Sequence, residues 1–159
     1  MIRPAAPADV PIIAQLIRDL AEYERLVHAV VLNEDDLRAH LFGPRPYAEV
    51  LMAEDAGTVV GFALFFHNYS TFGGRPGIYL EDLFVTPEAR GKGYGKALLA
   101  ALAALAKLAV ERGCRHVQWS VLNWNEPSIQ FYKSLGAKPM DEWTVYRVRD
   151  EALTKLASS

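Results

Sequence analysis

Two adjacent carboxylates, Glu81 and Asp82, interrupt an apolar run that extends from Tyr79 to Val85. A carboxylate in an apolar strand is costly to bury unless it is solvated or paired, so at least one of the two is expected to have a chemical role. Neighbouring side chains of a regular strand point to opposite faces of the sheet. We therefore expect that Glu81 and Asp82 do not both line the same side of a cleft.

A glycine-rich turn follows this run, after Pro87, which ends a strand because it lacks a ladder donor. Alternating glycines then precede an Ala/Leu run of helical spacing. Such a turn directs backbone N–H groups and a helix N-terminus at phosphate oxygens, although a simple tight turn explains three glycines about equally well. Neither a Walker A loop nor the dinucleotide fingerprint fits the spacing. The turn and its flanking cations comprise Arg90, Gly91, Lys92, Gly93, Gly95 and Lys96.

The run RGKGYG (residues 90–95) resembles the acyl-CoA pyrophosphate loop of the GNAT N-acetyltransferase superfamily. With it, YLEDLFV (79–85) and WNEPSIQFYKSLGA (124–137) resemble the diamine (spermidine/spermine) and thialysine acetyltransferase group. Three motifs in this order and spacing make the resemblance specific, and it covers most of the chain. It implies an α/β (α+β), GNAT-like mixed central sheet flanked by helices, with residues 1–159 forming a single domain.

The resemblance also implies that acetyl-CoA is the acyl donor. The edge of the apolar strand would pair with the pantetheine amides, and the glycine-rich loop would bind the pyrophosphate. Asn125 and Ser128 match positions that contact the donor, although ordinary helix capping also explains both residues. The implied donor-binding residues are Leu83, Phe84, Val85, Arg90, Gly91, Lys92, Gly93, Tyr94, Gly95, Lys96, Asn125 and Ser128.

Amine acylation needs a route for the proton of the ammonium group, whose pKa lies near 10, and a proton donor for the departing thiolate. By resemblance, Tyr132 is the general acid and Glu81 is a base that acts through water. A helix residue with an apolar body and a solvated hydroxyl is the alternative interpretation of Tyr132. Whether Glu81 is a base or an anchor for the substrate stays open.

The implied acceptor is a small cationic amine. Polyamine acetyltransferases carry an acid in the loop before YLED, where this chain has Ser70, Thr71 and Phe72. The missing carboxylate favours thialysine or another lysine-like amine over a long polyamine. We expect the tryptophans to lie in the core or in a cleft wall, and the remaining acids of the first two helices to be solvated. The implied substrate-binding residues are Tyr23, Glu24, Glu81, Asp82, Trp119 and Trp143.

Composition restricts the other classes of function. The 159 residues suit one globular domain, with 51% hydrophobic and 23% charged content. A net charge of −2 without blocks of like charge argues against nucleic acid as a partner. One cysteine excludes an intrachain disulfide, and the histidines show no metal spacing. We expect a cytoplasmic protein with neither a signal segment nor a membrane partner.

Three other functions remain as alternatives: a protein or peptide N-acetyltransferase, a non-catalytic acyl-CoA-binding sensor, and a structural domain with a coincidental turn. Family resemblance also implies a homodimer that uses C-terminal elements. Hydrophobic periodicity and caps predict the following strands: 1–3, 47–54, 59–69, 79–85, 116–122 and 144–148. Three predicted helices are capped at Asp9, Asn33 and Asn125. A further helix follows the glycine-rich turn and ends at Arg112, a short tail helix covers 150–157, and 70–77 is a loop or flap.

Overall fold

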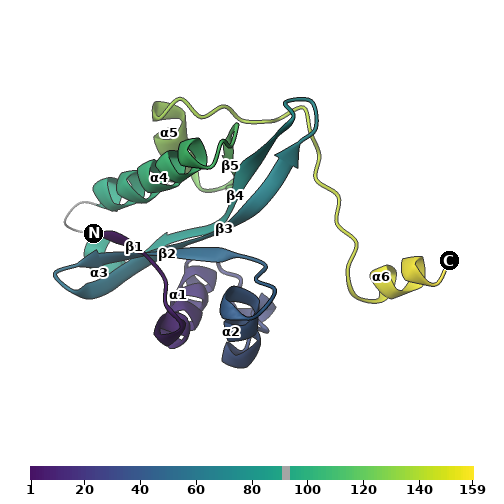
Figure 1. Cartoon of the computed structure of the whole chain (residues 1–159), viewed down its shortest axis with the longest axis horizontal. Helices are drawn as coiled ribbons and strands as arrows, with labels where there is room; N and C mark the ends of the chain where they lie inside the picture. Colours follow the sequence, from purple (N-terminus) through teal and green to yellow (C-terminus); the bar gives the residue numbers. More distant parts are fainter. Residues whose placement is uncertain (91–93) are drawn as a thin grey trace. The chain divides into compact units, whose positions relative to one another are not determined.

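The computed structural model covers the whole chain and describes residues 1–90 and 94–159. It divides into two compact units, Met1–Ser120 and Val121–Ser159, and each is described by itself (Figure 1). Gly91, Lys92 and Gly93 of the predicted phosphate-binding turn lie outside the described residues, as do the side chains of Arg90 and Tyr94.

The first unit is built on a five-stranded sheet whose spatial order, β1-β2-β3-β4-β5, is also the order of the strands along the chain. The first four strands pair antiparallel with their neighbours, whereas β4 and β5 are parallel. This arrangement confirms the predicted mixed sheet. The strands are β1 (Ile2–Pro4), β2 (Glu49–Asp55), β3 (Thr58–Ser70), β4 (Arg75–Val85) and β5 (Val117–Trp119).

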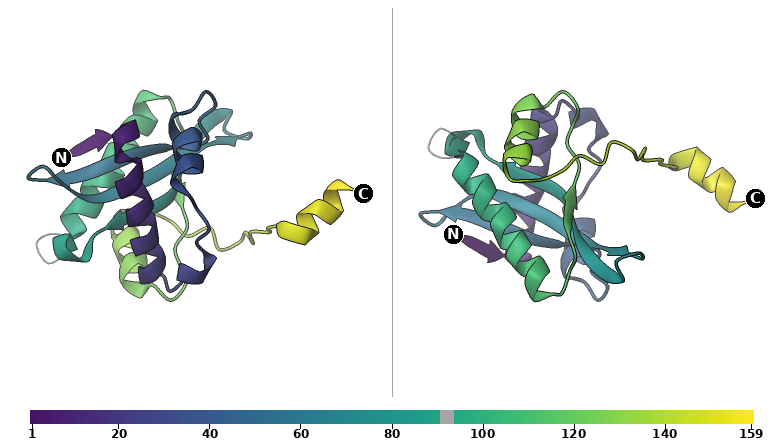
Figure 2. Two further views of the ribbon diagram at one scale, coloured as in Figure 1. Left: turned by 90° about the horizontal axis from the view of Figure 1, so that it is seen from below. Right: turned by 90° about the horizontal axis from the view of Figure 1, so that it is seen from above.

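Helices cover both faces of this sheet. Figure 2 shows α1 and α2 across one face and α4 across the other. The helical elements of the first unit are η1 (Pro7–Asp9), α1 (Val10–Tyr23), η2 (Val27–Ala29), α2 (Glu34–Phe42), α3 (Pro87–Arg90) and α4 (Tyr94–Glu111). The second unit contains α5 (Glu126–Ser134) and α6 (Asp150–Ala157).

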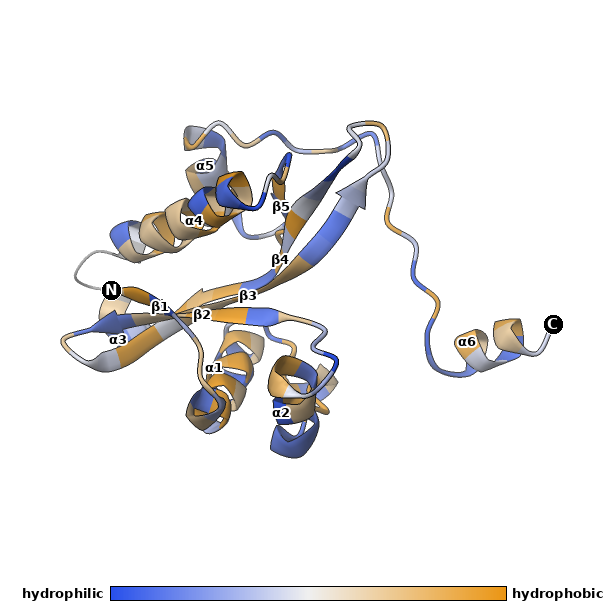
Figure 3. Ribbon diagram, viewed as in Figure 1, coloured by the Kyte–Doolittle hydropathy of each residue, from blue (hydrophilic) through white to orange (hydrophobic). Residues whose placement is uncertain are grey.

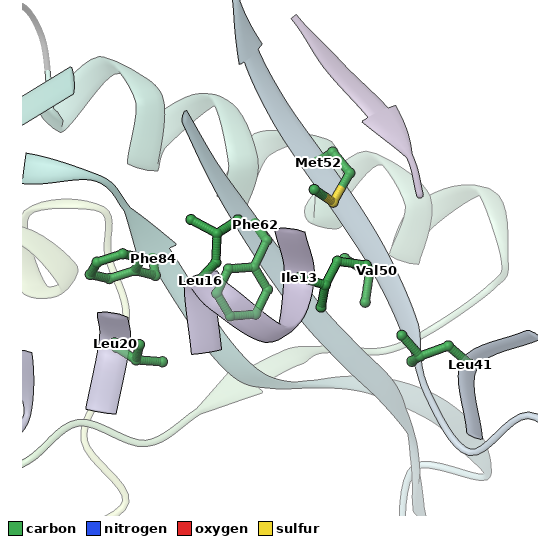
Figure 4. Packing of buried hydrophobic residues seen from close by; sticks show 8 residues of the cluster. All are labelled: Ile13, Leu16, Leu20, Leu41, Val50, Met52, Phe62 and Phe84. Atoms are coloured by element: carbon green, nitrogen blue, oxygen red, sulfur yellow. The ribbon is translucent and has the colours of Figure 1, made fainter. Parts of the chain in front are cut away.

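The main core lies between the sheet and the pair α1 and α2. Helical spacing places the apolar residues of α1 on one stripe, and buried residues of β2, β3 and β4 pack against that stripe. Hydrophobic residues recur along α1 and along these strands (Figure 3). Burial of each such side chain stabilises the fold by about 1.5–3 kcal/mol. Figure 4 shows the cluster: Ile13, Leu16, Leu20, Leu41, Val50, Met52, Phe62 and Phe84.

Two predicted helix caps behave differently. The Asn33 side chain accepts a hydrogen bond from the Asp36 backbone N–H at 2.8 Å, as its prediction as the cap of α2 requires. Asp9 makes no side-chain cap of α1. Its carboxylate instead accepts hydrogen bonds from the Ala6 backbone N–H and from the guanidinium of Arg3, which makes an ion pair with each of Asp9 and Glu54. The prediction of an Asp9 cap was therefore wrong, because a nearby cation competes for the carboxylate.

Three element boundaries also differ from prediction. The 70–77 loop reduces to a turn over 71–74, because β3 and β4 pair up to Ser70 and Arg75. The strand predicted over 116–122 shortens to β5, whose parallel pairing with β4 ends at Leu80. No strand forms over 144–148: this segment is exposed, and no described strand pairs with it. In the described part of the chain, no helix is long and apolar enough to span a bilayer.

Candidate active site

A β-bulge in β4 separates Glu81 from the regular ladder. Asp82 lies opposite Leu64 of β3 and Leu80 lies opposite Phe65, so Glu81 is the extra residue between the two pairs. A bulge sets two residues of one strand against one residue of its partner and re-aims side chains. Phe84, which follows Asp82 on the same face, packs in the core beneath α1. Asp82 therefore faces α1.

The bulge interrupts the strict alternation on which the expected opposite orientation of Glu81 and Asp82 rests. Burial raises the pKa of Asp82 to about 7, and repulsion from Glu81 and then Glu24 adds to the effect. Burial also raises the pKa of Glu24, followed by repulsion from Glu81. The three carboxylates thus act on one another electrostatically. We call Glu24, Glu81 and Asp82 the acidic trio.

The trio is assembled from the end of a helix and the bulge of a strand. Tyr23 is the last residue of α1 and Glu24 is its C-cap. A helix C-terminus carries partial negative charge, which adds to that of the carboxylates and favours a cation. Asp82 and Glu24 are partly buried, whereas Glu81 and Tyr23 are exposed. This end of α1 can therefore hold an ammonium group.

The end of β5 lies beside this site along the sheet. Trp119 is partly buried and pairs in register with Leu80, the residue before the bulge. The hydroxyls of Tyr79 and Ser120 lie 2.9 Å apart. Trp119 is thus partly buried at the same end of the sheet as the bulge, and its role as a wall of the site stays a prediction.

The predicted donor-binding residues of the first unit follow the bulge. Leu83 is partly buried, and Phe84 and Val85 are buried at the end of β4. α4 begins at Tyr94, directly after the glycine-rich turn, and Gly95 and Lys96 are exposed in its first turn. In the described part of the chain the order is β4, α3 and α4, and the N-terminus of α4 with its exposed Lys96 is a place that suits a phosphate group.

The second unit carries the predicted acid. Asn125 is the buried N-cap of α5, and its side-chain oxygen accepts a hydrogen bond from the Ser128 backbone N–H at 3.4 Å. The capping interpretation of Asn125 is therefore confirmed. Tyr132 follows Ser128 by four residues and so shares its helix face. Both side chains are partly buried, and the Tyr132 ring centroid lies 5.9 Å from that of Phe131.

Trp143 does not lie in a core. Its side chain is 73% exposed, in a part of the second unit that has no regular structure. Trp124 is also exposed. The expectation that the tryptophans lie in the core or in a cleft wall is therefore wrong for the core at these two positions, because both side chains are exposed.

Comparison with known proteins then shows the family. The sequence model of the "Acetyltransferase (GNAT) family" matches residues 13–137. The chain belongs to the GNAT acetyltransferase family. This GNAT protein is 40% identical over 168 residues to a thialysine N-epsilon-acetyltransferase of Bos taurus, with 99% of this chain and 96% of that protein covered. It is 34% identical over 197 residues to an L-ornithine N5-acetyltransferase of Arabidopsis thaliana, with 96% and 85% covered.

A solved structure supports the fold. An integron cassette protein from the mobile metagenome of V. cholerae superposes with a TM-score of 0.81 at 28% identity and covers 100% of this chain and 98% of its own. The protein is therefore an N-acetyltransferase with the GNAT α/β fold. Membership of this family implies acetyl-CoA as the donor.

Proposed function

We propose that this GNAT protein transfers the acetyl group of acetyl-CoA to a primary amine of a small cationic substrate, with a thialysine- or ornithine-like amino acid as the best candidate. The observation that carries the proposal is the acidic trio at the C-terminus of α1, where three carboxylates and a helix dipole favour a cation. The names of the relatives from Bos taurus and Arabidopsis thaliana support the same class of acceptor.

The donor would bind along the end of β4 and at the N-terminus of α4. Leu83, Phe84 and Val85 would position the pantetheine arm, and the turn at 90–96 would bind the pyrophosphate. Asn125 and Ser128 at the start of α5 would make further contacts. An exposed Lys96 in the first turn of α4 suits an anion. The matched region, residues 13–137, spans both compact units, which supports one acetyltransferase domain over the whole chain.

Tyr132 would give a proton to the leaving thiolate, and a carboxylate of the pair Glu81 and Asp82 would receive the first proton of the ammonium. Sequence resemblance favours Glu81, acting through water. A positioned acid or base of this kind contributes about 10²–10⁴-fold to the rate. Tyr23, Glu24 and Trp119 would line the amine site, and Trp143 would join it by resemblance.

The amine itself can be ranked. The turn between β3 and β4 carries Phe72, which is fully exposed, and Ser70, whose hydroxyl oxygen accepts a hydrogen bond from the Gly73 N–H at 3.1 Å. No acid stands among residues 70–77 to pair with the far ammonium group of a polyamine. Thialysine or ornithine should therefore exceed spermidine in kcat/KM.

The test measures thiol release from acetyl-CoA with thialysine, ornithine, lysine, putrescine, spermidine and a histone-tail peptide. We expect turnover with a short cationic amino acid and a fall in kcat of about 10²-fold in Tyr132→Phe. Lys133→Gln, on an exposed position of the same helix, is the matched control. Turnover with the peptide alone, or tight binding of acetyl-CoA without turnover, would overturn the proposal in favour of a protein acetyltransferase or a sensor.

A further inference from the structure

We propose that Asp82, rather than Glu81, is the carboxylate that accepts the proton from the substrate ammonium, and that Glu81 anchors the amine. This inference deepens the proposed function and rests on it. It starts from the bulge in β4, where Glu81 is the extra residue, and from Asp82, which shares the α1 face of the strand with the buried Phe84.

Exposure separates the two candidates. Glu81 is exposed on the bulge, so water surrounds its carboxylate. Asp82 is partly buried, opposite Leu64 and one alternation before the buried Phe84. A solvated carboxylate is well suited to attract a cation, whereas one shielded from water holds a proton more readily.

Like burial, the charges around Asp82 raise its pKa. Glu81 faces it from its own strand, and Glu24 faces it from the end of α1, flanked in sequence by Tyr23 and Arg25. Burial and these two carboxylates raise the pKa of Asp82 to about 7. Within the acidic trio, Glu24 and Glu81 thus supply negative charge for the ammonium group, and Asp82 supplies the oxygen that accepts its proton.

The magnitudes favour this division of roles. Proton transfer from an ammonium with a pKa near 10 to a carboxyl with a pKa of about 7 is unfavourable by roughly a thousandfold. Transfer to an unperturbed aspartate, with a pKa near 3.9, is unfavourable by roughly a millionfold. A base whose pKa lies near the working pH also loses its proton again between turnovers.

The protons balance as follows. The ammonium N–H bond breaks and its proton forms an O–H bond on the Asp82 carboxylate. The free amine attacks the thioester carbonyl carbon, the new C–N bond forms, and the C–S bond breaks as the thiolate takes the proton of Tyr132. The nitrogen's second proton returns to the Tyr132 phenolate through solvent, and Asp82 releases its proton to water, so each turnover frees one proton.

The kinetic test compares Asp82→Asn, Asp82→Glu and Glu81→Gln with the wild type between pH 5.5 and 9, on the amine that the substrate panel selects. Wild-type kcat should rise with pH through a midpoint near 7, because Asp82 must be ionised. Asp82→Asn should lower kcat by about 10²-fold or more and remove the rise of kcat with pH. Asp82→Glu should restore part of the rate and part of its pH dependence. Glu81→Gln should keep the rise of kcat with pH and mainly raise the KM for the amine. Glu22→Gln, on an exposed acid of α1, is the control.

The inference would be overturned by the opposite pattern, in which Glu81→Gln abolishes the rise of kcat with pH and Asp82→Asn keeps the wild-type kcat. A second readout needs no turnover: the side-chain carboxyl ¹³C signal of Asp82, assigned by its loss in Asp82→Asn, should titrate near pH 7 in the full-length protein. Titration near pH 4 would overturn the inference even in an active enzyme. Titration near pH 7 in a protein that acetylates no amine would instead reject the proposed function.

Discussion

The pKa of Asp82 lies within the pH range of an ordinary assay, so ionisation of this residue of the candidate site also affects the stability of the fold. Its pKa in the folded protein is about 7, above the value near 3.9 of an unfolded aspartate. Between these values the folded state binds the proton more tightly than the unfolded state does. The free energy of unfolding therefore falls as pH rises from about 4 to 7, and the loss persists above pH 7.

Asp82→Asn should remove this penalty. A shift of about three pKa units corresponds to at most ~4 kcal/mol, and partial exposure reduces it, so we expect a gain of about 1–3 kcal/mol in the free energy of unfolding at pH 8. The gain should disappear below pH 4, where Asp82 is neutral in both states. Urea denaturation of both proteins at pH 3.5, 6 and 8 measures the difference. A gain that is the same at all three pH values would show that the charge is not its cause.

At the scale of elements, the contact between β3 and β4 depends on a missing side chain. Gly61 pairs with Val85, and a Cβ at this position would press against the Phe84 carbonyl oxygen and lie 3.2 Å from Cγ2 of Val85. The strands would have to separate at the segment where we propose that the pantetheine arm lies. We therefore expect that a change in the packing of β3 against β4 at Gly61 also affects the binding of acetyl-CoA.

Gly61→Ala should lower the free energy of unfolding by about 1–3 kcal/mol, because the overpacked strands must shift. It should also raise the KM for acetyl-CoA. Chemical denaturation and steady-state kinetics measure the two effects. Gly95→Ala is the control for stability, since a methyl group there meets no atom within 4 Å. Unchanged stability in Gly61→Ala would contradict the close approach.

The sequence predicted the elements that local rules determine. The Asn33 cap, the Asn125 cap and the break at Pro87 depend on neighbouring residues, and all three are observed. The bulge at Glu81 depends on pairing with β3, which no local pattern encodes, and so the break in alternation between the two carboxylates could not be predicted. The strand expected over 144–148 has favourable β residues but no partner among the described strands, and propensity alone does not form a strand.

At the scale of the whole molecule, the C-terminal segment carries apolar side chains that the single chain leaves exposed. Large apolar side chains that gather exposed in one segment are typical of an interaction site. We propose a second copy of the chain as the partner, in line with the homodimer that family resemblance implies. The exposed side chains are Met140, Trp143, Val145, Tyr146, Val148, Leu153 and Leu156.

Removal of residues 139–159 should convert a dimer into a monomer, because it deletes the apolar surface that the second copy would cover. Light scattering after size-exclusion chromatography measures the mass of both forms. Val145→Asp should have the same effect through one buried charge, and Glu151→Gln, on an exposed acid of α6, should leave the dimer intact. A wild-type protein that elutes as a monomer at all concentrations would reject the proposal.

The order of the strands has a consequence for biosynthesis. Each strand of the sheet pairs with the strand made just before it, and only the parallel pair β4 and β5 needs a crossover, which α4 supplies. A nascent chain that leaves the ribosome N-terminus first therefore always has the next partner strand already synthesised. Trp119 ends the last described strand, so every described strand of the sheet is translated before the apolar C-terminal segment. The segment that carries many exposed apolar side chains is thus made last, after all the strands that form the sheet.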